Sequence, residues 1–579
     1  MADATTSPAE QAAEETRAAI QGCIDAGKSF LVEAGAGAGK TYSLIQALKY
    51  VIAKRGRDLL RHHQRVACIT YTNVAVDEID ARTDRHPAIQ SSTIHAFCWS
   101  MIRSFQPFLR SELRGLESWD ERLREVGGIG TRAISYDDLG HRSIDDTHAA
   151  LHHNDVLTLT VRLLAQRKFR MVLTSRYPIL FIDEYQDTDS AIAEALTTNV
   201  LDAGEGPLIG FFGDHWQKIY GTGCGKLEHP SLRIIGKKAN FRSVPAIVDC
   251  LNRMRPQLPQ QVRDPTTAGT VAVYHSNGWV GTRRLGQHWD GDLPPEVAGA
   301  YLDFLAKRLV CEGWDLSPEK TKVLMLTHRV LAARQGYDNL LGVFEYMDTA
   351  IRKEDPHIAF LIDGLEPVCA AYEKKRFGEM FAALGGRTPT IQSPPDKVAW
   401  TKDMDKLLEL RRTGTIGNVL DHLRRTKRPR LPDAVENRER ALEVPPQETG
   451  GEEPSPITRL RTLRDVSYQE LIRLAAFIND KTPFSTKHGV KGAEFENVLV
   501  VFGRGWNQYN FGQFLHWGDA PPPGKRDAFE RNRNLFYVAC SRPKKRLALL
   551  FTQKLSSQAV ATLAKWFGQN AIHSLQLSG

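Results

Sequence analysis

Short apolar runs recur along the chain, and most of them are followed by a stretch with helical periodicity. The first run, at 29–34, leads through a loop of Gly and Ala into an amphipathic stretch from Lys40 to about Ala53, which predicts strand, loop and helix. Similar runs lie at 65–72, 178–184, 207–214, 322–328, 497–503 and 546–552. Because continuous apolar runs between helices are typical of parallel strands buried on both faces, the pattern predicts an α/β fold with parallel sheets. The strands form two groups, one before about residue 240 and one after.

Two long regions break this rhythm. Residues 100–165 and 340–475 contain few strand-like runs and are expected to be mostly helical. Residues 1–15 predict a mobile arm that leads into a helix. Stretches rich in Pro and Gly at 385–396 and 445–456 predict flexible linkers within the second region.

The composition is that of a globular chain with several domains. At ~150 residues per domain, 579 residues predict about four domains. Hydrophobic residues make up 42% and charged residues 25%, which excludes collagen-like, low-complexity and wholly disordered classes. The balance of 76 Lys and Arg against 68 Asp and Glu gives a net charge of +8, which permits a polyanionic partner without demonstrating one.

Cysteine spacing and the N-terminal residues bear on the cellular compartment. The 8 cysteines lie far apart and form no CxxC pair, so a structural zinc or iron–sulfur site is not expected and a reducing cytosol fits best. The segment 1–15 lacks the basic and apolar regions of a secretory signal, and no run of ~18 apolar residues would span a membrane. We therefore expect a cytoplasmic protein with no membrane partner.

The strongest local signal is a glycine-rich loop between the first predicted strand and helix. Residues 34–41 read AGAGAGKT. Loop amides and a helix N-terminus can cradle phosphates, while the lysine reaches the β- and γ-phosphates and the threonine hydroxyl binds Mg²⁺. The alternative is an ordinary glycine-rich turn, since Ala34 stands where the strict pattern has Gly. The residues expected to bind the nucleotide here are Gly35, Gly37, Gly39, Lys40 and Thr41, with Thr41 also a metal ligand.

An apolar strand that ends in two acids supplies the second half of a nucleotide site. Residues 179–184 read ILFIDE, so Asp183 and Glu184 would lie at the C-terminal edge of a parallel sheet, where ligands bind. Asp183 can ligate Mg²⁺ directly or through water, and Glu184 can act as the general base on the attacking water. Such a strand end is a weak signal by itself, but together with the phosphate loop it predicts a site of nucleotide hydrolysis.

Further motifs follow one another along most of the chain. They are AGAGAGKT at 34–41, TYTN at 70–73, STIHAF at 92–97, DEYQDTD at 183–189, GDHWQKIYG at 213–221, NFRS at 240–243, TKHGVKGAEF at 486–495 and LFYVACSR at 535–542. In this order they resemble the motifs of the UvrD/PcrA/Rep helicases, the superfamily 1A DNA translocases. The matches cover the catalytic core of that family almost from end to end.

The resemblance implies roles at the nucleotide. Gln217 would sense the γ-phosphate, and Phe241, which replaces the family's Tyr, would stack on adenine. Arg242 and Arg542 would act as arginine fingers that stabilise the transferring phosphoryl group when the domains close. Glu494 would contact the ribose.

The same resemblance implies contacts with single-stranded DNA. Tyr71, His95 and His488 would lie along the strand, and Tyr71 would offer a stacking platform. Outside this series of motifs, ordinary packing would be the better interpretation of such side chains.

Several sites depart from the family pattern, and two of these departures concern expected contacts. The glutamine that reads the adenine edge aligns best with Thr16, and Gln21 is a candidate substitute. Thr222 and Gly223 stand where the family has Trp-Arg, so a stacking platform for DNA is either missing or supplied by another residue, for which Trp216 is a candidate.

The expected architecture is two RecA-like P-loop domains with ATP bound between them, each carrying a mostly helical insertion. The first domain would contain residues 1–99 and 166–235, with the insertion 100–165 between them. The second domain would contain residues 236–334 and 476–579, with the insertion 335–475, which carries the flexible linkers.

The activity that the resemblance implies is hydrolysis of ATP, with Mg²⁺, that drives 3′→5′ movement on single-stranded DNA and unwinding of tailed duplexes. A different hypothesis is a nucleotide- and DNA-sensing ATPase subunit that regulates a partner nuclease without processive unwinding. Short UvrD-like proteins of this size are found in anti-phage operons beside OLD-type (TOPRIM) nucleases, as in the Gabija system. No nuclease motif is apparent, so any nuclease is expected to be a separate chain. RNA is a third hypothesis for the substrate, because contacts that track the backbone are sequence-tolerant.

Overall fold

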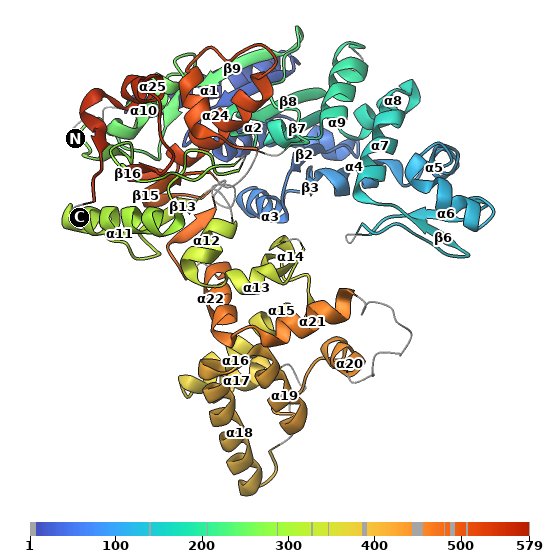
Figure 1. Ribbon diagram of the computed structural model, residues 1–579. Coiled ribbons are helices and arrows are strands. Elements are labelled where there is room, and N and C mark those ends of the chain that lie inside the picture. Colours follow the sequence, from blue (N-terminus) through green and yellow to red (C-terminus); the bar gives the residue numbers. More distant parts are fainter. Residues whose placement is uncertain are drawn as a thin grey trace, which may run out of the picture.

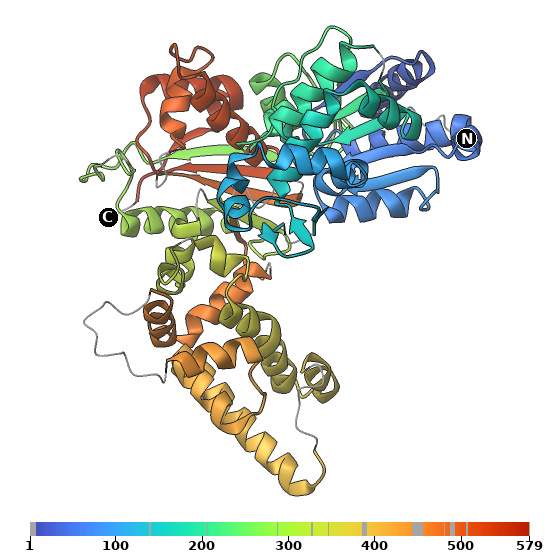
Figure 2. The ribbon, with the colours of Figure 1, turned by 90° about the vertical axis from the view of Figure 1, so that its right-hand side faces the viewer.

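Two six-stranded parallel β-sheets with their flanking helices, and a helical lobe, are the main parts of the molecule (Figure 1). The computed structural model describes residues 7–137, 140–204, 206–219, 221–286, 288–325, 328–345, 347–384, 391–442, 455–479, 481–486, 493–504 and 508–577. The lobe extends away from both sheets, as Figure 2 shows, and contains the helices from α13 (Asp338–Gly342) to α22 (Tyr468–Ile478). The predicted α/β class, with parallel sheets and mostly helical insertions, is confirmed.

The first sheet has the strand order β3-β2-β7-β8-β1-β9, and all of its pairs are parallel. Alternate residues of one strand face opposite sides, so Phe30 and Val32 belong to one apolar cluster and Leu31 to another. Helices α1 (Pro8–Asp25) and α2 (Lys40–Arg61) complete the first cluster. The strands are β1 (Phe30–Ala34), β2 (Val66–Thr70), β3 (Ile89–Thr93), β7 (Ile179–Asp183), β8 (Leu208–Gly213) and β9 (Arg233–Lys237).

Further helices flank this sheet and complete its two apolar clusters. They are α3 (Asn73–Arg82), α4 (Ile94–Ile102), α7 (His153–Leu164), α8 (Arg167–Arg176) and α9 (Ser190–Ala195). Since all strands are parallel, their carboxyl ends meet at one edge, where the loops after β1, β7 and β8 lie.

The second sheet has the order β14-β13-β15-β16-β12-β17 and is also parallel throughout. Val498 and Val500 pack in a cluster with one set of helices, whereas Leu499 and Val501 pack in the cluster that continues into the helical lobe. The strands are β12 (Thr270–His275), β13 (Thr321–Met325), β14 (Phe484–Thr486), β15 (Phe495–Phe502), β16 (Pro543–Phe551) and β17 (Ile572–Ser574). The helices beside them are α10 (Pro245–Met254), α11 (Pro295–Cys311), α23 (Phe511–Trp517), α24 (Arg526–Cys540) and α25 (Ser557–Phe567).

The two insertions differ in content. The first holds α5 (Gln106–Leu113), α6 (Asp120–Glu125) and α7, and also a small sheet of β4 (Ala133–Ser135), β6 (His148–Ala150) and β5 (Ser143–Ile144). Strands this short leave no periodic pattern, which is why the sequence did not predict them.

The second insertion follows α12 (His328–Gln335) and contains α13, α14 (Met347–Ile351), α15 (Pro356–Ala359), α16 (Glu366–Glu373), α17 (Phe377–Ala383), α18 (Pro394–Thr413), α19 (Ile416–Thr426), α20 (Asp433–Ala441), α21 (Ser455–Asp465) and α22. A further pair, β10 (Ala239–Asn240) and β11 (Gln261–Val262), lies between the two sheets in the sequence.

The predicted strands are confirmed, whereas the expected N-terminal arm is wrong from residue 8 on, and residues 1–6 lie outside the described residues. Each apolar run contains one of β1, β2, β7, β8, β13, β15 and β16. Helix α1 begins at Pro8, because the Ser7 hydroxyl accepts from the Glu10 N–H and the Glu10 carboxylate accepts from the Ser7 N–H. Most of the expected linkers, at 385–390 and 445–454, lies outside the described residues.

The expected domain boundaries remain a prediction, and four of them fall inside regular elements. The boundary after residue 99 lies in α4, the one after 235 in β9, the one after 334 in α12 and the one after 475 in α22. Since a hydrogen-bonded element is not divided between domains, we propose to move these boundaries to the ends of the elements. None of the helices in the described part of the chain has the length and apolar character needed to cross a membrane.

Candidate active site

The glycine-rich loop after β1 is closely approached by residues that follow β9. Gly37 and Gly39 have φ angles of 74° and 73°, in the left-handed region that other residues disfavour. A Cβ at Gly37 would lie 2.8 Å from the Cβ of Arg242, and a Cβ at Gly35 would lie 2.8 Å from Nε2 of Gln260. The loop therefore needs glycine both for its curvature and for this contact.

Lys40 starts α2 directly after the loop and faces an acid that follows β7. The Nζ of Lys40 lies 3.3 Å from Oε2 of Glu184, and the side chain of Gln186 donates to the same oxygen. Glu184 has a φ of 49°, which is rare for a residue other than glycine. Such conformations persist where the surroundings hold them, and they are frequent at active sites.

Asp183, the last residue of β7, is buried with an unsatisfied oxygen. Its Oδ1 has no hydrogen-bond partner among the residues that the structure describes. Burial raises the pKa of this carboxyl, and the charge of Glu184 raises it further. A buried carboxylate oxygen without a partner costs free energy, which a divalent cation would offset. The carboxylate of Asp183 and the hydroxyl of Thr41, in the first turn of α2, are the hard oxygen ligands that Mg²⁺ prefers, so these residues fit the ion.

Gln217 follows β8 and connects the two halves of the site. Its Nε2 donates to Oδ2 of Asp214 over 2.8 Å, and Nη2 of Arg542 donates to its Oε1 over 3.4 Å. Arg542 lies just after α24, and burial lowers the pKa of its guanidinium to about 9, with the charge of Arg242 acting in the same direction. The structure thus brings together the expected phosphate sensor and one expected arginine finger.

The other expected finger, Arg242, is paired with Glu494. The Nε of Arg242 donates to Oε1 of Glu494 over 2.9 Å, and its Nη1 donates to the carbonyl of Ser541 over 3.0 Å. Lys544 lies 3.1 Å from the other oxygen of Glu494. Burial acts to raise the pKa of Glu494, but the charges and hydrogen bonds of Arg242 and Lys544 outweigh it and lower the pKa.

A cavity of about 750 Å³ opens beside Gly39, between α1, α2 and Phe241. The Phe241 side chain is 39% exposed, so its ring is accessible for stacking. Gln21 lines this cavity. Thr16 does not line the cavity. It is buried, and its Oγ1 donates to the carbonyl of Ala12 within α1. Of the two candidates for reading adenine, only Gln21 is placed at the cavity.

The expected DNA contacts lie at the ends of neighbouring strands. Tyr71 follows β2 and is 49% exposed, and His95 stands in the first turn of α4, directly after β3. The ring of His95 lies 5.1 Å from the ring of His153 in α7. Burial lowers the pKa of His95, and the charge of His153 acts in the same direction. The third expected contact, His488, lies outside the described residues.

Trp216 is wrong as a candidate platform for DNA. Its side chain is only 7% exposed. The ring of Tyr537 lies 5.3 Å away, and the guanidinium of Arg533 lies 4.2 Å from the centre of the indole ring. Trp216 is therefore largely covered between the two halves of the molecule, and the exposed part of its ring is too small to serve as a stacking platform.

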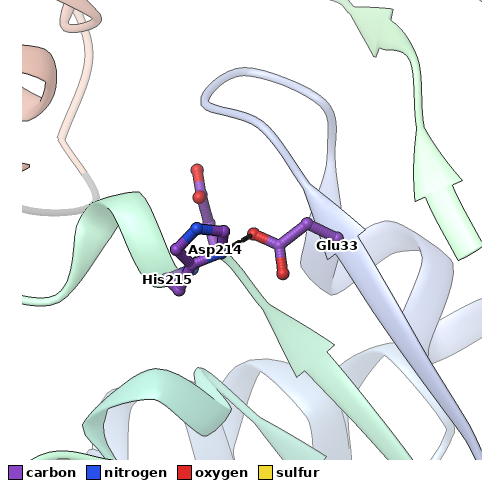
Figure 3. Close-up of side chains that lie close together, drawn as sticks. All are labelled: Glu33, Asp214 and His215. Atoms are coloured by element: carbon purple, nitrogen blue, oxygen red, sulfur yellow. Dashed lines mark hydrogen bonds and ion pairs between the residues drawn. The ribbon is translucent and has the colours of Figure 1, made fainter. Parts of the chain in front are cut away.

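A group of metal-ligand side chains lies where β1 and β8 end (Figure 3). Nδ1 of His215 donates to Oε1 of Glu33 over 2.7 Å, and the ligand atoms of these two residues and Asp214 lie within 4.8 Å of one another. However, Arg255 donates to both carboxylates, from Nη1 to Asp214 over 2.6 Å and from Nη2 to Glu33 over 2.7 Å. Since the guanidinium already supplies the positive charge between the two carboxylates, we assign no metal here.

Three polar residues of the site had no role in the sequence analysis. The N–H of Asp214 donates to the side chain of Gln186 over 2.9 Å, and the side chain of Asn240 donates to the carbonyl of Ala36 over 3.0 Å. Gln186 lies in the motif DEYQDTD and Asn240 in the motif NFRS, so their positions in these motifs could have indicated that they belong to the site. The third residue, Arg255, stands in none, and nothing in the sequence pointed to it.

Comparisons with known proteins find two matching families and two similar proteins. The model of a family described as AAA domain matches residues 16–223, and that of the UvrD-like helicase C-terminal domain matches residues 441–554. Gabija protein GajB of Bacillus cereus (strain HuB5-5) is 24% identical over 694 aligned residues, which cover 92% of this chain and 94% of that protein. Gabija protein GajB of Bacillus cereus (strain VD045) is 30% identical over 174 residues, 29% of this chain and 33% of that protein.

Proposed function

The chain belongs to the UvrD-like helicase family, and on this premise we propose that it is an ATP-dependent translocase that moves 3′→5′ on single-stranded DNA and unwinds tailed duplexes. One observation carries the proposal: Arg542, just before β16 of the second sheet, donates to Gln217, which follows β8 of the first sheet. A site completed by groups from two domains changes when the domains move. Hydrolysis there can be coupled to domain movement and thus to steps along DNA.

The nucleotide would bind with its phosphates in the loop 35–39. Lys40 would neutralise charge on the β- and γ-phosphates, and Thr41 and Asp183 would hold Mg²⁺. The ion, when bound, supplies positive charge to the phosphate oxygens. Glu184 would accept the proton of the attacking water, which requires that Lys40 exchange its contact with Glu184 for one with the phosphates.

The second domain would contribute the remaining groups. Phe241 would stack on the base in the cavity beside α1, and Gln21, which lines this cavity, would contact the base edge. Arg242 and Arg542 would stabilise the transferring phosphoryl group. Movement of Arg242 toward the phosphates would free the carboxylate of Glu494 for the ribose.

Single-stranded DNA would follow the edge of the first sheet. Tyr71 would supply a stacking surface there, and His95 and His488 would lie along the same strand. The exposed ring of Tyr71, directly after β2, supports this path.

A second candidate is a nucleotide- and DNA-sensing ATPase subunit that regulates a partner nuclease in anti-phage defence. The similarity to Gabija protein GajB over nearly the whole length of both chains favours it. The partner would be a separate nuclease of the OLD/TOPRIM type. For either role we propose a cytoplasmic location, which the 8 free cysteines support.

Parallel ATPase and strand-separation assays distinguish these functions. The purified chain would be tested on duplexes with 3′ tails, with 5′ tails and without tails, and on single-stranded RNA, with Lys40→Ala as the inactive control. Unwinding of 3′-tailed duplexes alone supports the translocase. DNA-stimulated hydrolysis without unwinding supports the sensing subunit, and stimulation by RNA alone would contradict the assignment of DNA as substrate. Absence of hydrolysis under all conditions would contradict both candidates.

A further inference from the structure

Arg255 connects the second half of the molecule to the core of the first. It directly follows α10, whose residues Ile247 and Leu251 pack in one apolar cluster with Leu547 and Leu549 of the second sheet. The side chain is only 2% exposed, and its two terminal nitrogens donate to Glu33, in β1 of the first sheet, and to Asp214, which directly follows β8.

Both carboxylates that Arg255 holds are directly connected to the candidate active site. Glu33 lies in β1, and Ala34 is the only residue between it and the phosphate loop. Asp214 is completely buried, and its Oδ2 accepts from Nε2 of Gln217 over 2.8 Å. The N–H of Asp214 donates to Gln186, whose own side chain donates to Glu184. A single hydrogen-bonded network therefore runs from Arg255 to the phosphate sensor and to the proposed base.

The geometry of this contact suits a guanidinium and no other cationic side chain. Its planar fork reaches two carboxylates at once, over 2.6 and 2.7 Å, and its centre lies 5.2 Å from the ring of Trp216. A lysine at position 255 would carry the same charge but would act as a point donor. Asp214, which accepts from Arg255 on one oxygen and from Gln217 on the other, would then be held less firmly. The side chain of Gln217 would also lose its fixed orientation.

We infer that Arg255 is a positioning residue for nucleotide hydrolysis, by which the second domain holds Asp214 and thereby orients Gln217 at the γ-phosphate. The inference rests on the proposed ATPase function. Arg255 touches no reacting atom, so its loss acts on the geometry of the transition state more than on nucleotide binding. Since the residue belongs to the second domain, domain movement is transmitted to Gln217 through it.

The test compares Arg255→Lys with the wild type and with Arg253→Gln. Arg253 is a matched control, because it lies two residues earlier and donates to the carbonyl of Trp566, away from the first sheet. We would measure kcat and KM for ATP with and without single-stranded DNA, together with the melting temperature. For Arg255→Lys we expect kcat to fall by about 10²-fold, because a displacement of a catalytic group by about 1 Å can lower the rate by this factor. We also expect KM to change less than about threefold and the stimulation by DNA to be lost.

A charge-matched variant guards against unfolding. Removal of the guanidinium leaves the buried carboxylates of Glu33 and Asp214 without the charge of Arg255, which can prevent folding. If Arg255→Lys does not fold, the double variant Arg255→Gln with Glu33→Gln replaces it, because it removes one negative charge together with the positive one. A folded variant with wild-type kcat and DNA stimulation would overturn the inference, and so would an equal loss in Arg253→Gln. If the wild type hydrolyses ATP and only the variants behave contrary to expectation, the inference alone fails. If the wild type does not hydrolyse ATP, the proposed function fails with it.

Discussion

The Nζ of Lys40 lies 3.3 Å from Oε2 of Glu184, although the two residues are 144 positions apart in the chain. The cation of the phosphate loop is thus paired with the proposed general base. Phosphates that bind in the loop must compete with Glu184 for this cation. The pair therefore connects nucleotide binding to release of the base.

Glu184→Gln should stop turnover but keep nucleotide binding. The amide cannot take the proton of water, and a lost general base costs about 10²–10⁴-fold in rate. Because Lys40 loses its carboxylate partner, we expect equal or tighter binding of a fluorescent ATP analogue. Lys40→Ala is the contrasting variant, in which the phosphates lose their point charge and binding weakens. Normal phosphate release by Glu184→Gln would show that another group is the base.

Arg242→Ala and Arg542→Ala should each lower kcat far more than they raise KM. Arginine fingers contribute about 10³–10⁵-fold to the rate in other phosphoryl-transfer enzymes. Lys544→Ala is a suitable control, since Lys544 shares the carboxylate of Glu494 with Arg242 but is not an expected finger. Steady-state kinetics with ATP measures both constants. If the two arginine variants lost binding and kept turnover, the arginines would be ground-state ligands instead.

Gln21→Ala should raise KM for ATP, whereas Thr16→Val should leave it unchanged. Gln21 lines the cavity beside Phe241, while the Thr16 hydroxyl is satisfied inside α1. Since one lost hydrogen bond is worth about 0.5–1.5 kcal/mol, we expect a change in KM of about 2- to 12-fold. Measuring KM for both variants decides between the positions, and an effect of Thr16→Val alone would reverse the assignment.

Tyr71→Ala should reduce the stimulation of hydrolysis by DNA and leave hydrolysis without DNA nearly intact. A stack between a base and an aromatic ring is worth about 1–3 kcal/mol. Thr222→Trp, at an exposed position, should have the opposite effect by adding a platform. The family's Trp-Arg pair cannot be restored in full, because a Cβ at Gly223 would lie 2.3 Å from the carbonyl oxygen of Gln186. ATPase titrations with single-stranded DNA test both variants, and full stimulation of Tyr71→Ala would place the DNA elsewhere.

Lys237→Met should change the pH dependence of stability. Lys237 is buried, with Nζ donating to the carbonyl of Gly39 over 2.9 Å and to the hydroxyl of Ser43 over 2.6 Å. Burial lowers its pKa to about 8, against ~10.4 in an unfolded chain. Below about pH 8 the amine of Lys237 is protonated in both the folded and the unfolded chain, and its buried charge destabilises the folded state. Between about 8 and ~10.4 only the unfolded chain binds the proton, so the stability of the wild type rises with pH.

The measurement for this variant is the melting temperature at pH 7 and pH 10. The melting temperature of Lys237→Met minus that of the wild type should be smaller at pH 10 than at pH 7. Lys238→Met, at the exposed neighbouring position, should show no such trend. A difference between Lys237→Met and the wild type that does not depend on pH would contradict a buried charged amine.

The elements of the fold could be read from the sequence wherever a local pattern carries the information. The apolar runs around Val32, Phe181 and Leu549 predicted strands, because burial on both faces demands continuous apolar residues. The phosphate loop and the two acids at the end of β7 could be recognised for a similar reason, since each of these motifs consists of neighbouring residues. The short strands β4, β5 and β6 and the capping of α1 were not predicted, because their local signals are weak or depend on single hydrogen bonds.

Which distant side chains meet was decided only by the tertiary structure. Arg255 holds Glu33 and Asp214, Trp216 is enclosed by Arg533 and Tyr537, and neither contact has a signature in the sequence. The same is true of the choice between Thr16 and Gln21, which depends on the face that α1 turns toward the cavity. Periodicity and motif spacing are properties of neighbours along the chain, and they determined where the elements lie and where a phosphate site is expected. Contacts across the two sheets depend on how the elements pack, and packing is decided by the shape and charge of the whole molecule.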